Sequence, residues 1–208
     1  MIAIIDYDAG NLTSVQRAVS YLGIDCVITK EAAEIKAAER IIFPGVGAAG
    51  AAMQSLQRNG LDRVIKDAFA VGKPVLGICI GSQIILAHSE ENDTPCLGII
   101  DGTVRSFLPD HRSEDGQKLK IPHMGWNGLN IKQSHPLLSG ISAADEFYFV
   151  HSYYPAPRDS NCVIAETEYG ISFASIIGLN NLFATQFHLE KSGPPGLKVL
   201  DNFCKWQP

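Results

Sequence analysis

Short apolar runs alternate with stretches of helical periodicity over the first part of the chain. The apolar runs lie at 2–6, 26–28, 40–43 and 74–78 and are rich in β-branched residues. Between them, apolar positions recur at helical spacing over 13–22, 31–39, 51–57 and 61–70. Short strands that are buried on both faces and alternate with helices predict a largely parallel sheet with helices on both sides.

The pattern changes after about residue 95, where strand-like runs follow one another without intervening helices. These runs lie at 102–107, 146–151, 162–168, 171–177 and 182–187, and helical periodicity returns over 196–206. We expect the runs to extend the sheet in an antiparallel or mixed arrangement that the last helix closes. No repeat or linker interrupts the chain, so we expect a single domain over residues 1–208. The predicted fold class is α/β, a three-layer sandwich with a largely parallel, mixed central sheet.

Composition narrows the classes of function. The chain has 208 residues, of which 46% are hydrophobic and 19% charged, and its net charge is −5. This acidic balance gives no sign of a nucleic-acid or membrane surface, and no apolar run approaches the ~20 residues of a membrane span. The five cysteines are widely spaced and form no metal-ligand pattern, and phosphate- and dinucleotide-binding motifs are absent. We therefore expect a cytoplasmic protein without metal or cofactor.

The stretch from Gly77 to Gly81, GICIG, has the form of a nucleophile elbow with Cys79 in the place of serine. Glycines two positions either side leave room for a strained turn from strand to helix, and we expect the helix to continue from 81 to 88. A helix N-terminus lowers the pKa of a cysteine and favours the nucleophilic thiolate. The alternative is a buried structural cysteine.

A base and an oxyanion-binding group are also present in the sequence. His188 directly follows the apolar run 182–187, and Glu190 stands two residues further on. Residues two apart in an extended segment point to the same side, so Glu190 can orient His188. The segment 44–47, PGVG, follows another strand and offers accessible backbone N–H groups to an oxyanion. The ends of parallel strands meet at one edge, so this segment and Cys79 can share a crevice. A structural histidine and a plain turn are the alternatives.

Six stretches, in order from end to end of the chain, resemble the class-I glutamine amidotransferases. Within that family they are similar to the glutaminase subunits of imidazole glycerol phosphate synthase. The stretches are IIDYDAGNLTSV (4–15), FPGVGAAGAAM (43–53), GICIGSQIIL (77–86), HMGWN (123–127), YFVHSYY (148–154) and QFHLEKS (186–192). The resemblance implies the flavodoxin-like fold of this family.

The resemblance also implies roles for individual residues. Cys79 would attack the side-chain amide of L-glutamine, His188 would protonate the departing ammonia, and Glu190 would position His188. Water activated by His188 would then hydrolyse the acyl-enzyme to glutamate. Oxyanion donors are implied at the backbone of Gly45, Val46, Gly47 and Ile80.

Glutamine contacts are implied at Gln83, at Glu91 and along the backbone of His151, Ser152 and Tyr153. The carboxylate of Glu91 suits the α-ammonium group of glutamine. From the residues alone, Gln83 could equally be a helix-surface residue and Glu91 a solvated acid.

The family implies a partner that uses the ammonia. It is a (β/α)₈-barrel cyclase subunit that forms a heterodimer and makes imidazole glycerol phosphate and aminoimidazole carboxamide ribonucleotide in histidine biosynthesis. The docking face is implied at the loop 8–11, with Asn11, and at Met124, Trp126 and Asn127. Met124 and Trp126 could instead be core residues. In this family the nucleotide-bound cyclase activates the glutaminase, so we expect low activity of the isolated chain.

Three positions depart from the family pattern: Leu189 stands where proline is usual, Ser82 where methionine is common, and Asp8 where glycine is usual. None removes a group that the chemistry requires. A paralogous glutaminase subunit that feeds a different synthase, or a non-catalytic binding module on the same fold, are the alternative functions.

Overall fold

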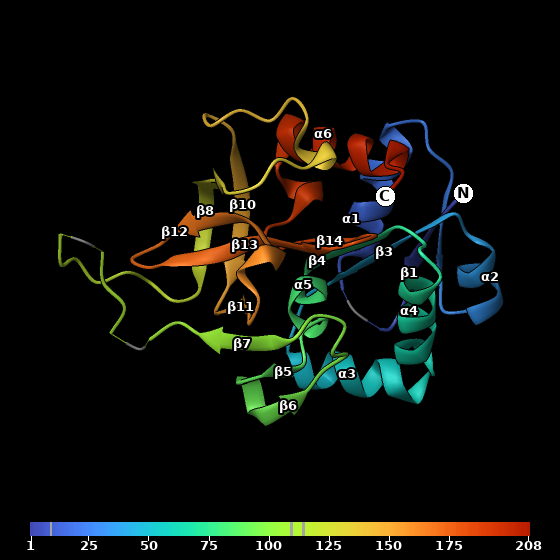
Figure 1. Cartoon of the computed structure of the whole chain (residues 1–208), viewed down its shortest axis with the longest axis horizontal. Coiled ribbons are helices and arrows are strands. Elements are labelled where there is room, and N and C mark those ends of the chain that lie inside the picture. Colours follow the sequence, from blue (N-terminus) through green and yellow to red (C-terminus); the bar gives the residue numbers. More distant parts are fainter. Residues whose placement is uncertain (9, 109, 114) are drawn as a thin grey trace.

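The computed structural model describes residues 1–8, 10–108, 110–113 and 115–208, so residue 9 of the predicted docking loop lies outside the description. An eight-stranded sheet forms the centre of the molecule (Figure 1). Its strands are β1 (Ile2–Ile5), β2 (Cys26–Thr29), β3 (Arg40–Gly45), β4 (Val75–Cys79), β9 (Asn130–Ile131), β12 (Val163–Glu168), β13 (Ser172–Leu179) and β14 (Leu182–Thr185). They are ordered β2-β1-β3-β4-β14-β13-β12-β9. The first five in this order are parallel, and the rest pair antiparallel.

Helices cover both faces of the sheet. They are α1 (Leu12–Tyr21), α2 (Ala32–Ala37), α3 (Ala49–Arg58), α4 (Leu61–Ala70), α5 (Ile80–Ile84) and α6 (Gly193–Lys205). Helices α1 and α6 lie on one face, and α3, α4 and α5 on the other (Figure 1). The side chains of β1 show how the layers form: Ile2 and Ile4 pack with α1 and α6, whereas Ala3 and Ile5 pack on the opposite side.

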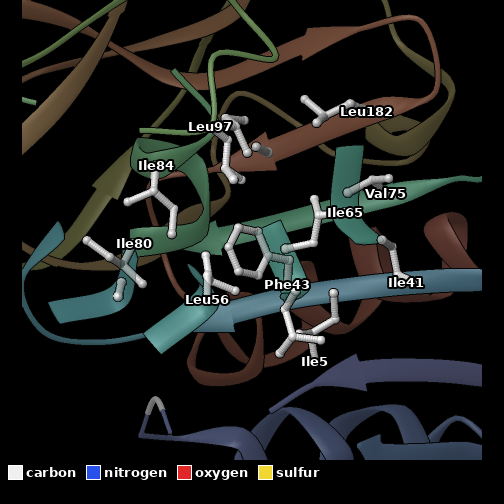
Figure 2. Packing of buried hydrophobic residues seen from close by; sticks show 14 of the residues in the cluster. Ile5, Ile41, Phe43, Leu56, Ile65, Val75, Ile80, Ile84, Leu97 and Leu182 are labelled. Carbon is white, nitrogen blue, oxygen red and sulfur yellow. The ribbon is translucent and has the colours of Figure 1, made fainter. Parts of the chain in front are cut away.

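The hydrophobic core on the α3–α5 side surrounds Phe43, which is fully buried (Figure 2). Side chains from β3, β4, α3 and α5 meet there, among them Leu56, Ile80 and Ile84 (Figure 2). The start of α5 is therefore packed against the same core that holds the end of β3.

Two smaller sheets flank the central one. The first consists of β5 (His88–Ser89), β6 (Thr94–Pro95), β7 (Gly102–Ser106) and β11 (Tyr153–Pro157). The second is a two-stranded ribbon of β8 (His123–Gly128) and β10 (Glu146–His151). Among the described residues, no helix is long and apolar enough to cross a membrane.

The predicted α/β sandwich with a mixed central sheet is confirmed, but two details were wrong. The runs at 102–107 and 146–151 form strands of the smaller sheets and do not extend the central one. The helix expected over 81–88 ends at Ile84. Its next carbonyls accept hydrogen bonds from a returning segment instead of from the helix, for example Ile84 O from Leu97 N at 2.8 Å and Leu86 O from Gly98 N at 2.7 Å.

Candidate active site

Three strands of the parallel part of the sheet end side by side and bring the candidate residues to one edge. In the register of β3 with β4, Gly45 lies opposite Cys79. On the other side of β4, β14 ends at Thr185, three residues before His188. Residues from three distant parts of the sequence thus meet at the carboxyl end of the sheet, where ligand sites of such folds lie.

At Cys79 the chain turns sharply from β4 into α5. The backbone of Cys79 has φ 54° and ψ −107°, a region that non-glycine residues rarely adopt. Gly81 makes the turn possible, because a Cβ there would lie 2.0 Å from the carbonyl oxygen of Phe43. Cys79 is 7% exposed and lines a cavity.

His188 and Glu190 form a buried pair beside this cysteine. The Nδ1 atom of His188 lies 2.7 Å from Oε1 of Glu190, and both side chains are almost completely buried. The His188 backbone is held by a 2.9 Å hydrogen bond to the carbonyl of Tyr148. Among the described residues, Nε2 of His188 has no hydrogen-bond partner, so this nitrogen is free to exchange a proton with a nucleophile or a leaving group.

The electrostatics of the site favour a charged imidazole. Burial by itself lowers the pKa of His188, but interactions with Cys79 and Glu190 outweigh it and raise the pKa to about 9. A histidine that is held protonated next to a cysteine stabilises the thiolate form of that cysteine. The pair of Cys79 and His188 can therefore act as nucleophile and general acid.

A cavity of about 350 Å³ opens in front of the cysteine. Its size falls in the range of small-molecule sites. It is lined by Val46, Gly47, Cys79, Ile80, Gln83, Glu91, Pro122, Val150, His151, Ser152 and Tyr153. Nine of these residues are among those predicted from the sequence, and only Pro122 and Val150 were not anticipated.

The candidate oxyanion residues surround the nucleophile. Val46, Gly47 and Ile80 line the cavity, whereas Gly45 lies at the end of β3 and is not among the lining residues. Gly47 has φ 109°, a conformation that glycine adopts readily. Within the described residues, the N–H groups of Val46 and Gly47 donate no hydrogen bond and so remain available to a ligand.

Gln83 and Glu91 also have partners inside the protein. Gln83 is 4% exposed, which excludes the helix-surface alternative, and its Nε2 donates to the Tyr153 carbonyl at 2.9 Å and to Oε1 of Gln186 at 3.0 Å. Oε2 of Glu91 accepts a 2.7 Å hydrogen bond from the backbone N–H of Ala49, at the start of α3. Its carboxylate is thereby fixed at the cavity wall.

The residues assigned to docking differ in exposure. Met124 and Trp126 are 61% and 53% exposed, so the alternative that they belong to the core is wrong. Asn127 is half-buried, and its side chain donates to the Glu168 carbonyl at 2.9 Å. Asn11 does not point only outward, because its side-chain amide donates a hydrogen bond to Oε1 of Glu190.

Sequence reasoning missed Gln186 as a neighbour of the nucleophile. Its fully buried side chain donates from Nε2 to Sγ of Cys79 at 3.8 Å. A signal was available, because Gln186 lies only two residues before His188, the candidate base. Among the described residues, no group of three or more histidine, cysteine or acidic side chains is arranged to hold a metal ion.

The chain is similar to known proteins over nearly its whole length. The glutamine amidotransferase class-I family matches residues 3–206. The imidazole glycerol phosphate synthase subunit HisH of Nitratidesulfovibrio vulgaris (strain DSM 19637 / Miyazaki F) is 56% identical, over 99% of this chain and 98% of that protein. The subunit of the same name from Aromatoleum aromaticum is 47% identical, over 100% of this chain and 99% of that protein.

Solved structures share the fold at low sequence identity. A glutamine amidotransferase superposes with a TM-score of 0.72 at 16% identity, covering 98% of this chain and 100% of that one. PurLQS from Thermotoga maritima gives a TM-score of 0.72 at 17% identity, covering 98% of this chain and 97% of that one.

Proposed function

This chain belongs to the class-I glutamine amidotransferase family, and from that premise we propose that it is the glutaminase subunit of an imidazole glycerol phosphate synthase in histidine biosynthesis. The proposal rests on one observation above all: a buried pair of His188 and Glu190 lies beside Cys79, at the mouth of a cavity that glutamine can fill. Its full-length similarity to subunits named HisH supports the choice of synthase. We further propose that residues 1–208 form one amidotransferase domain that works in the cytoplasm.

The proposed reaction has two halves. The Cys79 thiolate attacks the side-chain amide carbon of glutamine, and the resulting oxyanion accepts hydrogen bonds from the backbone N–H groups of Ile80 and of Val46 or Gly47. Nε2 of His188 donates its proton to the nitrogen as the C–N bond breaks, which releases ammonia and leaves a thioester. Water then gives a proton to His188 and attacks the thioester carbon. The C–S bond breaks, the new carboxyl group loses its proton to solvent, and glutamate leaves the Cys79 thiolate beside protonated His188.

Substrate recognition uses the cavity wall. The carboxylate of Glu91 pairs with the α-ammonium group of glutamine, and Gln83 with the backbone at 151–153 forms a further part of the cavity wall. Leu189, where the family usually has proline, is fully buried, and Nδ1 of His188 still lies 2.7 Å from Glu190.

We propose a (β/α)₈-barrel cyclase as the partner in a heterodimer. Ammonia released into neutral water is mostly protonated and lost as a nucleophile, so a synthase must receive it directly. Met124 and Trp126 place two large apolar side chains on the exposed strand β8, a composition that suits the centre of an interface.

The test is glutamate release from L-glutamine by the purified chain, alone and with a matching cyclase subunit and its nucleotide ligand. We expect low activity alone, strong stimulation by the partner, and none in Cys79→Ala. Cys162→Ala is the matched control, because Cys162 is 6% exposed and lies outside the cavity. High activity without a partner would indicate a free-standing glutaminase. No activity under either condition would favour a subunit of another synthase or a binding module.

A further inference from the structure

We infer that Tyr7 is a positioning residue of this site: its hydroxyl holds the segment 44–47 where the N–H groups of that segment meet the oxyanion. The inference rests on the proposed glutaminase function and adds a residue to it. Tyr7 does not line the cavity, so it acts through the backbone of its neighbours and not on the substrate.

The first observation is a buried hydrogen bond. Tyr7 is 2% exposed, and its hydroxyl donates to the carbonyl oxygen of Pro44 at 2.7 Å. Its ring lies against Phe43, with the ring centroids 5.1 Å apart. Because Pro44 immediately precedes the glycine opposite Cys79 in the register, this bond fixes the peptide plane at the entry to the oxyanion segment.

The second observation is the close approach to Gly45. A Cβ on Gly45 would lie 1.9 Å from the Tyr7 hydroxyl oxygen and 2.5 Å from Cγ2 of Ile80. The hydroxyl of Tyr7 and the side chain of Ile80, which follows the nucleophile, therefore both pack against Gly45 in the space that a side chain would fill. A displacement of Tyr7 changes the position of Gly45 relative to Ile80.

The residues that follow Tyr7 are tied to α3 and also contact the segment 44–47. Asp8 has φ 64°, and its Oδ2 accepts hydrogen bonds from Ser55 Oγ at 3.0 Å and from Arg58 Nη2 at 2.9 Å, which ties the chain after β1 to α3. A Cβ on Gly10 would lie 2.9 Å from Cγ2 of Val46, so this part of the chain also contacts the segment directly.

The chemistry of Tyr7 suits a permanent donor. Burial, and then the charge of nearby Cys79, raise the pKa of the Tyr7 hydroxyl well above its ordinary value. The hydroxyl therefore keeps its proton, and the hydrogen bond to Pro44 persists at every pH at which the enzyme works.

The test is Tyr7→Phe, which removes only the hydroxyl, compared with wild type in complex with the cyclase subunit and its nucleotide ligand. Loss of a direct oxyanion donor lowers kcat by about 10²–10³-fold, and an indirect loss is smaller, so we expect kcat for glutamine hydrolysis to fall by roughly 10-fold. KM should stay within about twofold, because the substrate contacts remain.

Alkylation of Cys79 by iodoacetamide separates this role from a general structural one. Displacement at the sp³ carbon of iodoacetamide forms no oxyanion, so the alkylation rate in Tyr7→Phe should match that of wild type. The control is Tyr169→Phe, which removes a second 2.7 Å hydrogen bond from a tyrosine hydroxyl to a carbonyl, that of Lys120, outside the cavity. It should change neither rate.

Amide hydrogen exchange gives a readout that does not depend on activity. We expect the peptide that contains 44–47 to exchange faster in Tyr7→Phe than in wild type or Tyr169→Phe. If the wild type is active and Tyr7→Phe changes neither kcat nor the exchange of 44–47, the role of Tyr7 is overturned and the proposed function stands. An equal fall in kcat and in alkylation shows a disturbed nucleophile and also overturns it. If the wild type releases no glutamate, the proposed function is overturned. If the exchange of 44–47 is also unchanged in Tyr7→Phe, the positioning contact is overturned as well.

Discussion

The side-chain amide of Asn11 and the nitrogen Nδ1 of His188 both bond to the same oxygen, Oε1 of Glu190. Asn11 lies directly before α1, as its N-cap residue, whereas Glu190 lies close to the start of α6. A residue that the family resemblance assigns to the docking face is thus in direct contact with the buried carboxylate of the candidate triad.

Loss of this contact should weaken catalysis. In Asn11→Ala, Glu190 loses one of the two groups that fix its carboxylate, so the His188 ring is less well oriented. We expect kcat of the complex to fall by roughly 10-fold, the size of a typical acid–base contribution that is partly lost. Steady-state kinetics at saturating partner measures the effect. Asn202→Ala, which removes an amide bonded to carbonyls elsewhere, should retain full kcat.

Glu91→Gln should raise KM for glutamine. The change removes the charge that faces the α-ammonium group but keeps an oxygen that can accept the bond from Ala49 N. A lost charged hydrogen bond corresponds to about 1.5–3 kcal/mol, so we expect KM to rise by about 10- to 100-fold with little change in kcat. The neighbouring Glu90 accepts a bond from Ser106 N and does not line the cavity, so Glu90→Gln should leave KM as it is.

Buried histidines should make the fold sensitive to acid. Burial lowers the pKa of His123 and His135 to about 4 and that of His151 to about 3, against an ordinary value of 6.5. Below pH 6.5 the unfolded chain binds protons that the folded chain does not, so stability falls as pH drops from about 6.5 towards 4. Urea unfolding at pH 7 and pH 5 measures this loss.

His135→Asn tests the contribution of one histidine. Asparagine can still accept the bond from Leu137 N, so the change removes titration more than structure. We expect the fall in unfolding free energy between pH 7 and pH 5 to shrink by on the order of 1–2 kcal/mol. The contribution of His188 to the free energy of unfolding has the opposite pH dependence, because its pKa is raised to about 9. The stability that His188 contributes is present below pH 6.5 and is lost as pH rises through 9.

Trp126→Ala should weaken binding of the cyclase. Trp126 is 53% exposed and contacts the Tyr148 ring at 5.9 Å, so it offers a large apolar surface held in place. Loss of such an anchor lowers affinity by about 100-fold. Calorimetric titration of the two subunits measures it. Val71→Ala, on the exposed end of α4, should bind normally; equal affinity of Trp126→Ala and wild type would place the interface elsewhere.

The fold of the first half of the chain was predicted well from the sequence, because β1, β3 and β4 are buried on both faces and each helix has one apolar side. Strand β8 escaped prediction. Its sequence, HMGWNG, contains two glycines and an asparagine, and it forms a strand because β10 pairs with it along its whole length. The end of α5 at Ile84 was equally hidden, because the segment that stops it lies more than ten residues further along the chain.

The candidate site divides in the same way. Cys79, His188 and Glu190 stand in local patterns that indicate their chemistry. The contact of Asn11 with Glu190 joins positions at opposite ends of the sequence, and nothing near either residue encodes it. The hydrogen bond from Tyr7 to Pro44 is hidden for the same reason.

The position of β14 next to β4 has a consequence for how the protein is made. The residues of β4 are complete when the ribosome has translated Cys79. The strand that pairs with the second edge of β4 is translated about half a chain length later. Until Leu182–Thr185 emerges, the growing polypeptide carries an apolar strand with an open edge, which invites pairing with other chains. His188 arrives directly after that strand. The nascent chain therefore gains its closed sheet and its base together, so that a prematurely terminated product would be both prone to aggregate and unable to release ammonia.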